Sequence, residues 1–224
     1  MKNRMIAILA ALLLTVSASG ASNFSDRFSL RLSPGGLLPV GGQFSDSVKL
    51  SKAVRIGFGL NVGLRYKVND YFYLDAGYTF DWMGVKRSYQ PTEYKVEGQT
   101  PALHLSMITL NSTFFLSTGY ALAPYVTIGA GMFPWRFTQR AFGGKTWPAP
   151  SKPENEFAST DFGLNCGLGV ETYLASRCMI FAELKYHYVF ARHPAKFGTD
   201  DFTQQDFLGL NIGLVYHFRG KRPG

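Results

Sequence analysis

The sequence predicts an all-β fold, specifically an eight-stranded antiparallel up-and-down transmembrane β-barrel. Three observations lead to this prediction. Apolar residues recur at every second position over segments long enough to cross a bilayer, and these residues are too bulky to fit inside a small barrel. The connections between the segments also alternate between short and long. Together the three observations describe a closed sheet with an apolar outer wall.

The alternation is clearest over residues 55–68, where large apolar residues occupy every second position and glycine, asparagine or a basic residue falls between most of them. A period of two is the signal of a strand, because a helix repeats its faces with a period near 3.6. Residues 71–82 repeat the pattern after a tight turn. The same pattern marks a first strand near 28–32 and three late strands at 162–174, 180–190 and 208–218.

Two middle strands, at about 102–116 and 124–137, alternate less cleanly. Apolar residues stand at odd positions over 103–107 and at even positions over 108–114. This switch indicates either a β-bulge in the fourth strand or an error in the register assigned to it, and the sequence leaves the register of both middle strands open. Pro134 interrupts the fifth strand in a similar way, since proline cannot donate a ladder hydrogen bond.

The size of the alternating side chains decides which way they point. An eight-stranded barrel is only wide enough for a limited set of interior side chains, so these residues must face outward. Such a wall is expected in lipid, and strands of about 10 to 14 residues suit a tilted span that needs about 9 to 11. A soluble barrel of the lipocalin type is the architectural rival. The volume argument and the lack of a Gly-x-Trp near the mature N-terminus disfavour it.

The connections near 68–70, 118–123 and 175–177 are short, whereas those near 36–52, 85–100, 138–158 and 191–204 are long. Short periplasmic turns and long outer loops are typical of barrels in bacterial outer membranes. This alternation of short and long connections therefore predicts that both termini are periplasmic.

Residues 1–21 have the pattern of a secretory signal peptide, with Lys2 and Arg4 followed by a short apolar run and then small residues. Cleavage after Gly20 or Ala21 fits equally well. The apolar run is too short to span a bilayer, and the chain has no second run of this helical kind. A mature chain that enters a membrane without helices must do so as a closed barrel.

The predicted organisation is a signal peptide at 1–21, a barrel at 22–218 and a short basic extension at 219–224. Removing the signal peptide lowers the formal net charge from +8 to +6. This balance suits an anionic membrane surface, and export makes nucleic acid an unsuitable partner. Cys166 and Cys178 lie far apart if 175–177 form a hairpin turn, roughly 27 Å along the strand at about 3.4 Å per residue. A disulfide between them is therefore not expected.

The closing segment, residues 211–218, contains a polar residue, a glycine and alternating apolar residues that end in phenylalanine. It resembles the closing strand of small outer-membrane barrels of the OmpA, OmpX and OmpW type, also called the porin-like or outer-membrane β-barrel family. The resemblance covers essentially all of the mature chain. It implies an outer-membrane location and recognition by the barrel assembly machinery through a β-signal, although this chain continues past the usual aromatic end. The matching β-signal positions are Asn211, Gly213, Tyr216 and Phe218.

Charged residues of the inward parity are expected to fill the lumen. Charges of both signs in a narrow barrel must pair or cost several kcal/mol each, which favours a plugging network. Inward glycines leave volume unfilled and favour a narrow polar pore, and the sequence leaves these alternatives open. The expected lumen residues are Arg31, Arg55, Arg65, Asp75, Asp81, Glu171, Glu183, Lys185 and His187.

Aromatic residues near the strand ends are expected to form the interface girdles: Tyr66, Phe72, Trp82, Trp135, Phe190 and Tyr216. The long loops carry basic residues that can contact lipopolysaccharide phosphates, namely Lys86, Arg87, Lys95, Arg140, Lys145 and Lys152. Exposed Trp147 or Tyr89 can serve adhesion. The alternative is that the loops simply cap the barrel.

The sequence gives little support to catalysis. Lipid A deacylases carry a His-x-Ser-Asn element, but neither His187 nor His193 is followed by such a serine. His104 and Ser106 can share a strand face, yet no orienting acid accompanies them in the sequence. No His, Cys or carboxylate cluster has metal-ligand spacing, and no glycine pattern forms a phosphate loop, so no metal or cofactor is predicted.

The sequence thus predicts a non-enzymatic integral outer-membrane protein that is structural or weakly pore-forming. Its expected partners are outer-membrane lipid, lipopolysaccharide and the barrel assembly machinery, and it is expected to be a monomer. A narrow OmpW-like channel for small solutes is the second hypothesis. An adhesin or a lipid-modifying barrel enzyme is the third.

Overall fold

The computed structural model describes residues 27–45, 48–90, 100–117, 121–140, 144–149, 152–197 and 202–218. The predicted signal peptide and the predicted C-terminal extension lie outside the described residues and remain predictions.

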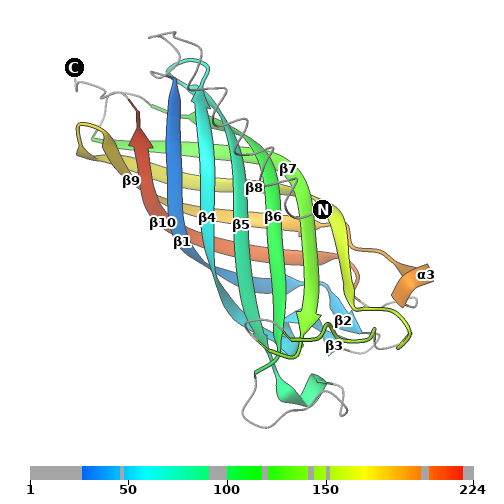
Figure 1. The fold of residues 1–224 in the computed structure, drawn as a ribbon. Helices are drawn as coiled ribbons and strands as arrows, with labels where there is room; N and C mark the ends of the chain where they lie inside the picture. Colours follow the sequence, from blue (N-terminus) through cyan, green and yellow to red (C-terminus); the bar gives the residue numbers. More distant parts are fainter. Residues whose placement is uncertain are drawn as a thin grey trace, which may run out of the picture.

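Eight long strands form one closed antiparallel barrel (Figure 1). Each strand pairs with its neighbours along the chain, and the first and last strands, β1 and β10, pair to close the sheet. The prediction of an eight-stranded up-and-down barrel is confirmed. The strands are β1 (Phe28–Gly41), β4 (Val54–Lys67), β5 (Phe72–Val85), β6 (Ala102–Phe115), β7 (Leu122–Thr138), β8 (Ala158–Ala175), β9 (Cys178–Val189) and β10 (Gln205–His217).

The two ends of the barrel differ in their connections. At one end the strands are joined by short turns, and the carboxamide oxygen of Asn69 accepts backbone N–H groups of Tyr71 and Phe72 at 2.9 Å each in the β4–β5 turn. The long connections at the other end contain the small elements β2 (Gln43–Ser45), β3 (Val48–Lys49), α2 (Leu50–Ala53), η1 (Arg87–Tyr89) and α3 (Pro194–Phe197). Figure 1 shows β2, β3 and α3 gathered there. In the part of the chain that the structure describes, no helix is long and apolar enough to cross a membrane.

The outward positions carry the large apolar side chains that the alternation predicts. Leu110 is 71% exposed, Ile56 67% and Leu168 64%, whereas the inward Arg65 is 1% exposed. A surface this apolar is stable only in a nonpolar solvent, so the barrel wall is built for a lipid bilayer.

The fourth and fifth strands are continuous, and the expected bulge in the fourth strand is wrong. The interruption expected at Pro134 is present in one ladder, because β6 and β7 have no pairs between Leu105↔Trp135 and Ile108↔Met132. The β5–β6 register runs without a shift from Phe72↔Phe114 to Gly84↔Ala102. Odd residues of β6 over 103–107 face inward and are buried, while Ile108 and Leu110 face the bilayer and are exposed. Both faces are apolar because this end of the lumen is itself apolar, so the alternation fades although the register holds. Pro134 lies within β7, opposite Thr160 of β8.

The β4–β5 and β1–β10 ladders each contain an irregularity. The β4–β5 register shifts between Val54 and Gly57, and this bulge leaves both Arg55 and Ile56 exposed. In the closing ladder, β1 and β10 have no pairs at Ser33 and Pro34, between Leu32↔Leu214 and Gly35↔Asn211.

The two cysteines are free. Cys166 lies opposite Tyr186 in the middle of the β8–β9 ladder, whereas Cys178 lies opposite Ala175 at the short turn. The separation along the strand is the physical reason that they do not meet.

Candidate functional site in the barrel lumen

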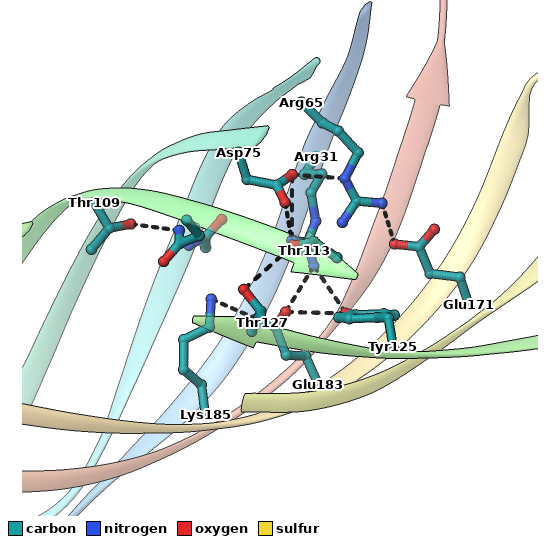
Figure 2. Close-up of polar contacts among 12 residues, drawn as sticks. Arg31, Arg65, Asp75, Thr109, Thr113, Tyr125, Thr127, Glu171, Glu183 and Lys185 are labelled. Carbon is teal, nitrogen blue, oxygen red and sulfur yellow. Dashed lines mark hydrogen bonds and ion pairs between the residues drawn. The ribbon is translucent and has the colours of Figure 1, made fainter. Parts of the chain in front are cut away.

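Six buried charged side chains fill the lumen towards the short-turn end; they are called the ionic network here (Figure 2). All of them stand at inward positions of their strands, so the period-two alternation delivers them to one place. Three are cations and three are carboxylates, and their formal charges balance. The ionic network consists of Arg31, Arg65, Asp75, Glu171, Glu183 and Lys185.

Arg65 of β4 joins two carboxylates on different sides of the barrel. Its Nε donates to Asp75 Oδ1 of β5 at 2.7 Å, and its Nη1 donates to Glu171 Oε1 of β8 at 2.5 Å. Strand β8 pairs with neither β4 nor β5, so the bond to Glu171 crosses the lumen. The second oxygen of Asp75 accepts a hydrogen bond from Thr113 Oγ1 at 2.6 Å. This part of the network therefore ties distant strands together.

Arg31 of β1 makes the second crossing, because its Nη2 donates to the hydroxyl oxygen of Tyr125 on β7 at 3.2 Å. Its Nη2 donates to Glu183 Oε2 of β9 at 3.3 Å, and its Nη1 lies 3.8 Å from Asp75 Oδ1. The Tyr125 hydroxyl donates to the same Glu183 oxygen at 3.1 Å, and Lys185 Nζ lies 2.9 Å from Glu183 Oε1. Each carboxylate of the network is thus held by at least one cation, and breaking one partner leaves a buried charge that costs about 3–5 kcal/mol.

Aromatic rings enclose the two guanidinium groups. The Arg65 guanidinium carbon lies 5.4 Å from the Tyr73 ring centre, 5.6 Å from that of Phe115 and 5.9 Å from that of Tyr125. A Cβ at Gly169 would lie 2.2 Å from Tyr125 Cζ, so only glycine on β8 lets the tyrosine ring lie flat against the wall. The sequence analysis missed Tyr125 as a lumen residue. Its odd position in β7, shared with the inward Thr127, was the available signal.

A small cavity of about 10 Å³ lies beside the ionic network and has room for about one water molecule. Arg31, Asn61, Asn111 and Lys185 are among its lining residues. Among the described residues, Arg31 Nε and Asn111 Oδ1 are buried without a hydrogen-bond partner, which is the condition under which proteins recruit internal water. A cavity of this size does not amount to a channel.

The lumen towards the long-loop end is filled by apolar and aromatic side chains, called the mouth cluster here. It combines inward residues of the strand ends with residues from the long connections, all buried. The Phe137 and Phe157 rings stack with centres 4.7 Å apart, and Trp135 lies 4.0 Å from Phe202. The main members are Leu37, Phe44, Leu50, Met83, Leu103, Leu105, Met107, Phe133, Trp135, Phe137, Trp147, Phe157, Phe197, Phe202 and Phe207.

Backbone hydrogen bonds fix the long connections over this end. Phe202 N–H donates to Phe44 C=O at 3.3 Å, and Trp147 N–H donates to Phe137 C=O at 3.0 Å. Phe202 and Gln204 adopt φ angles of 50° and 44°, which are unfavourable for residues other than glycine. The packing of Phe202 against Trp135 offsets that local strain. The described parts of these connections therefore form a folded layer over the long-loop end, called the lid below.

A polar contact secures one edge of the lid. His193 Nε2, next to α3, contacts Asp161 Oδ1 of β8 and lies 3.1 Å from Ser159 Oγ. The other Asp161 oxygen accepts a hydrogen bond from Trp135 Nε1 at 2.5 Å. The serine and the aspartate meet the same imidazole nitrogen, whereas a catalytic triad uses opposite nitrogens. The arrangement holds the lid and lacks the geometry of a nucleophile with an oriented base.

Most residues expected in the lumen are brought together by the structure. The six members of the ionic network meet near the short-turn end, and Asp81 and His187 are buried nearer to the mouth cluster. Arg55 requires a correction, since the bulge in β4 turns it to the exposed outer wall. The pattern 55–68 gave no sign of the bulge, because a displaced arginine preserves the apparent alternation.

The expected girdle also needs one correction. Phe190 and Tyr216 are exposed on the wall, and Tyr66, Phe72 and Trp82 are partly exposed there. Trp135 instead points into the lumen and is 3% exposed, because odd positions of β7 face inward. The expectation of exposed loop aromatics was likewise wrong, as Trp147 is buried and Tyr89 packs partly buried against the mouth cluster.

His104 and Ser106, the candidate catalytic pair, have separate hydrogen-bond partners in the structure. His104 Nε2 contacts Thr138 Oγ1 at 2.9 Å, and Ser106 Oγ contacts the Tyr78 hydroxyl at 3.3 Å. The β-signal positions lie on or just after β10, where Gly213 is buried and Asn211, Tyr216 and Phe218 are partly or fully exposed. Among the described residues, no group of three or more His, Cys, Asp or Glu side chains is arranged to hold a metal ion.

The comparisons with known proteins decide the family. A family model for the outer membrane protein β-barrel domain matches residues 6–218. The chain belongs to the outer-membrane β-barrel family. Membership implies the bacterial outer membrane. Barrels of this membrane have short periplasmic turns and long outer loops, so the short-turn end is the expected periplasmic end. No curated protein matches the chain.

Solved structures of outer-membrane barrels resemble it. Neisserial surface protein A is 15% identical, with 85% of this chain and 96% of that chain covered and a TM-score of 0.56. OprG from Pseudomonas aeruginosa is 17% identical, with 85% and 95% covered and a TM-score of 0.49. Ail from Yersinia pestis, in complex with the heparin analogue sucrose octasulfate, is 16% identical, with 85% and 98% covered and a TM-score of 0.47. At such identities the likeness to Neisserial surface protein A shows the fold alone.

Proposed function

We propose that this protein is a non-enzymatic, structural outer-membrane barrel with a closed lumen, which presents a folded lid at the outer surface. The observation that carries the proposal is that two chemically different fillings block the lumen in series. A solute that passed the mouth cluster would next meet the ionic network. Crossing it would require separating buried ion pairs, at several kcal/mol for each uncompensated charge.

The side-chain chemistry of the lumen also favours a structural role. Each carboxylate of the ionic network is paired with a cation, so none is a free base or nucleophile. His193 shares one nitrogen between Asp161 and Ser159, and His104 and Ser106 have separate hydrogen-bond partners. These contacts support the non-enzymatic proposal.

Single-channel recording in planar bilayers tests the closed lumen. The protein is purified from outer membranes. The shift in gel migration between unboiled and boiled samples verifies that its strands form a folded barrel. We expect no steady conductance above that of the bare bilayer. A Phe137→Ala/Phe202→Ala variant should also stay silent, because the ionic network remains in place. Stable ohmic steps from the unaltered protein would contradict the proposal and support a narrow channel instead.

A further inference from the structure

The outer wall carries few charges, and they are unevenly placed. Within the eight strands, the acidic and basic residues at outward positions are Arg55 of β4, Arg136 of β7 and Asp206 of β10. The two arginines are exposed, whereas Asp206 is half-buried. Strands β4 to β7 are consecutive in the barrel, and β10 lies outside that arc. One side of the wall is therefore cationic.

The described residues place no carboxylate against this cationic side. The only acidic residues of β4 to β7 are Asp75 and Asp81, and both are buried in the lumen. Among the described residues, no carboxylate oxygen lies within salt-bridge distance of the Arg55 or Arg136 guanidinium. Two unneutralised arginines on an apolar wall are costly in hydrocarbon, and they need an anion at the height where they stand.

The aromatic residues of the same arc fix that height. Phe58 and Trp82 contact each other edge to face with ring centres 5.5 Å apart, and Trp82 lies opposite His104, which in turn lies opposite Arg136. Aromatic side chains of this kind mark the bilayer interface, so Arg136 stands at the level of the lipid headgroups. Arg55 lies beyond Phe58 towards the long loops.

The bulge in β4 has a direct effect on this surface. Without the register shift between Val54 and Gly57, Arg55 would share the inward parity of Gly57 and Gly59. The shift turns it outward, and its side chain passes Gly84 of β5, where a Cβ would lie 4.0 Å from Arg55 Cδ. Bulges commonly re-aim a side chain at a functional surface.

We propose that the β4–β7 arc of the outer wall binds phosphate groups of lipopolysaccharide in the outer leaflet, through Arg55 and Arg136. Three inter-strand spacings of roughly 4.8 Å separate β4 from β7, and Arg55 lies level with Thr138, two residues beyond Arg136. The two arginine positions are therefore about 16 Å apart. That spacing suits a headgroup that carries two phosphates. Guanidinium groups bind phosphate with strong charge-assisted hydrogen bonds, and the wall below accepts acyl chains.

Binding of lipid A to the purified barrel in detergent tests the proposal, with diphosphoryl lipid A as the probe and native mass spectrometry as the readout. An Arg55→Gln/Arg136→Gln variant should bind diphosphoryl lipid A at least about tenfold more weakly, the equivalent of one charge-assisted contact. A matched control, Lys49→Gln/Arg192→Gln, removes the same charge from exposed positions outside the arc and should change binding less than about twofold.

Two further comparisons keep the test decisive. Lipid A without phosphates should bind the unaltered protein and the wall variant equally, and Arg55→Lys/Arg136→Lys should retain part of the affinity. Equal losses in the wall and control variants would overturn the proposal, as would equal binding of phosphorylated and phosphate-free lipid A by the unaltered protein. The boiling-dependent gel shift verifies that each variant is folded. This outcome is independent of the conductance test, which concerns the lumen.

Discussion

The two ends of the lumen achieve closure by opposite chemistry. At the short-turn end, Arg65 reaches across the barrel to Glu171, and Arg31 pairs with Glu183 on a strand that is not its ladder partner. At the outer end, rings such as Phe137 and Phe157 stack in a dry cluster to which loops and strands both contribute. The ionic network depends on exact partners, whereas the mouth cluster depends on filled volume.

The two ends are therefore expected to respond differently to substitutions. A buried ion pair contributes little net stability compared with an apolar replacement of both partners, but losing one partner is severe. An aromatic cluster loses stability in proportion to the cavity that a substitution leaves. Single substitutions should therefore be most damaging in the ionic network, and their effect there should depend on pH.

The largest effect is expected from Arg65→Met. It leaves Asp75 and Glu171 buried without their shared cation, and the free energy of unfolding should fall by about 3–5 kcal/mol. The loss should shrink as the pH falls, because protonating a buried carboxylate removes the charge that the substitution leaves uncompensated. Urea unfolding in lipid vesicles, followed by tryptophan fluorescence, measures it. Arg55→Met, at an exposed position, is the control and should change stability by less than about 0.5 kcal/mol; similar losses in both variants would refute the special role of the ionic network.

Phe137→Ala should have the next largest effect. The ring contacts Phe157, Trp147 and Phe202, and removing it should cost about 3 kcal/mol through lost burial and a cavity. The loss should be independent of pH, in contrast to that of Arg65→Met. The same urea titration at two pH values measures it. Phe190→Ala, whose side chain faces lipid, should cost less because acyl chains fill the space, and the reverse order would contradict the mouth cluster.

The smallest effect is expected from His193→Gln at the edge of the lid. Loss of the contacts with Asp161 and Ser159 should cost about 1 kcal/mol, confined to the lid. Amide hydrogen exchange should then accelerate in residues 191–197 and stay unchanged in the barrel strands. Arg192→Gln, on the adjacent exposed residue, should leave exchange unchanged. Faster exchange throughout β8 would show instead that the histidine supports the barrel.

The strands were predictable because lipid and the narrow lumen impose opposite demands on alternate residues. That logic located all eight long strands and placed Arg31, Asp75 and Glu183 on the inward face. The same reasoning fails in β6, where the odd residues over 103–107 are apolar although they face inward. A run that is apolar on both faces also fits an apolar lumen, and the alternation alone does not distinguish that from a bulge or a wrongly assigned register.

Other features could not be predicted from the alternation of apolar and polar residues. The bulge that turns Arg55 outward arises from local pairing with β5, and the sequence around it reads as a regular strand. Burial of Trp147 depends on the way its loop folds back over Phe137, which involves residues distant in sequence. Contacts such as Arg65 to Glu171 also depend on which strands face each other across the barrel, and parity alone does not specify that.

The gap in the ladder between β1 and β10 weakens the seam at which the barrel closes. Pro34 has no N–H to give to β10, and the pairs at Ser33 and Pro34 are missing where the two ends of the sheet meet. Every other seam joins neighbours along the chain, which remain tethered by a turn or loop when they separate. The β1–β10 seam has neither a tether nor a full ladder, so we expect it to separate before the other seams when the barrel unfolds.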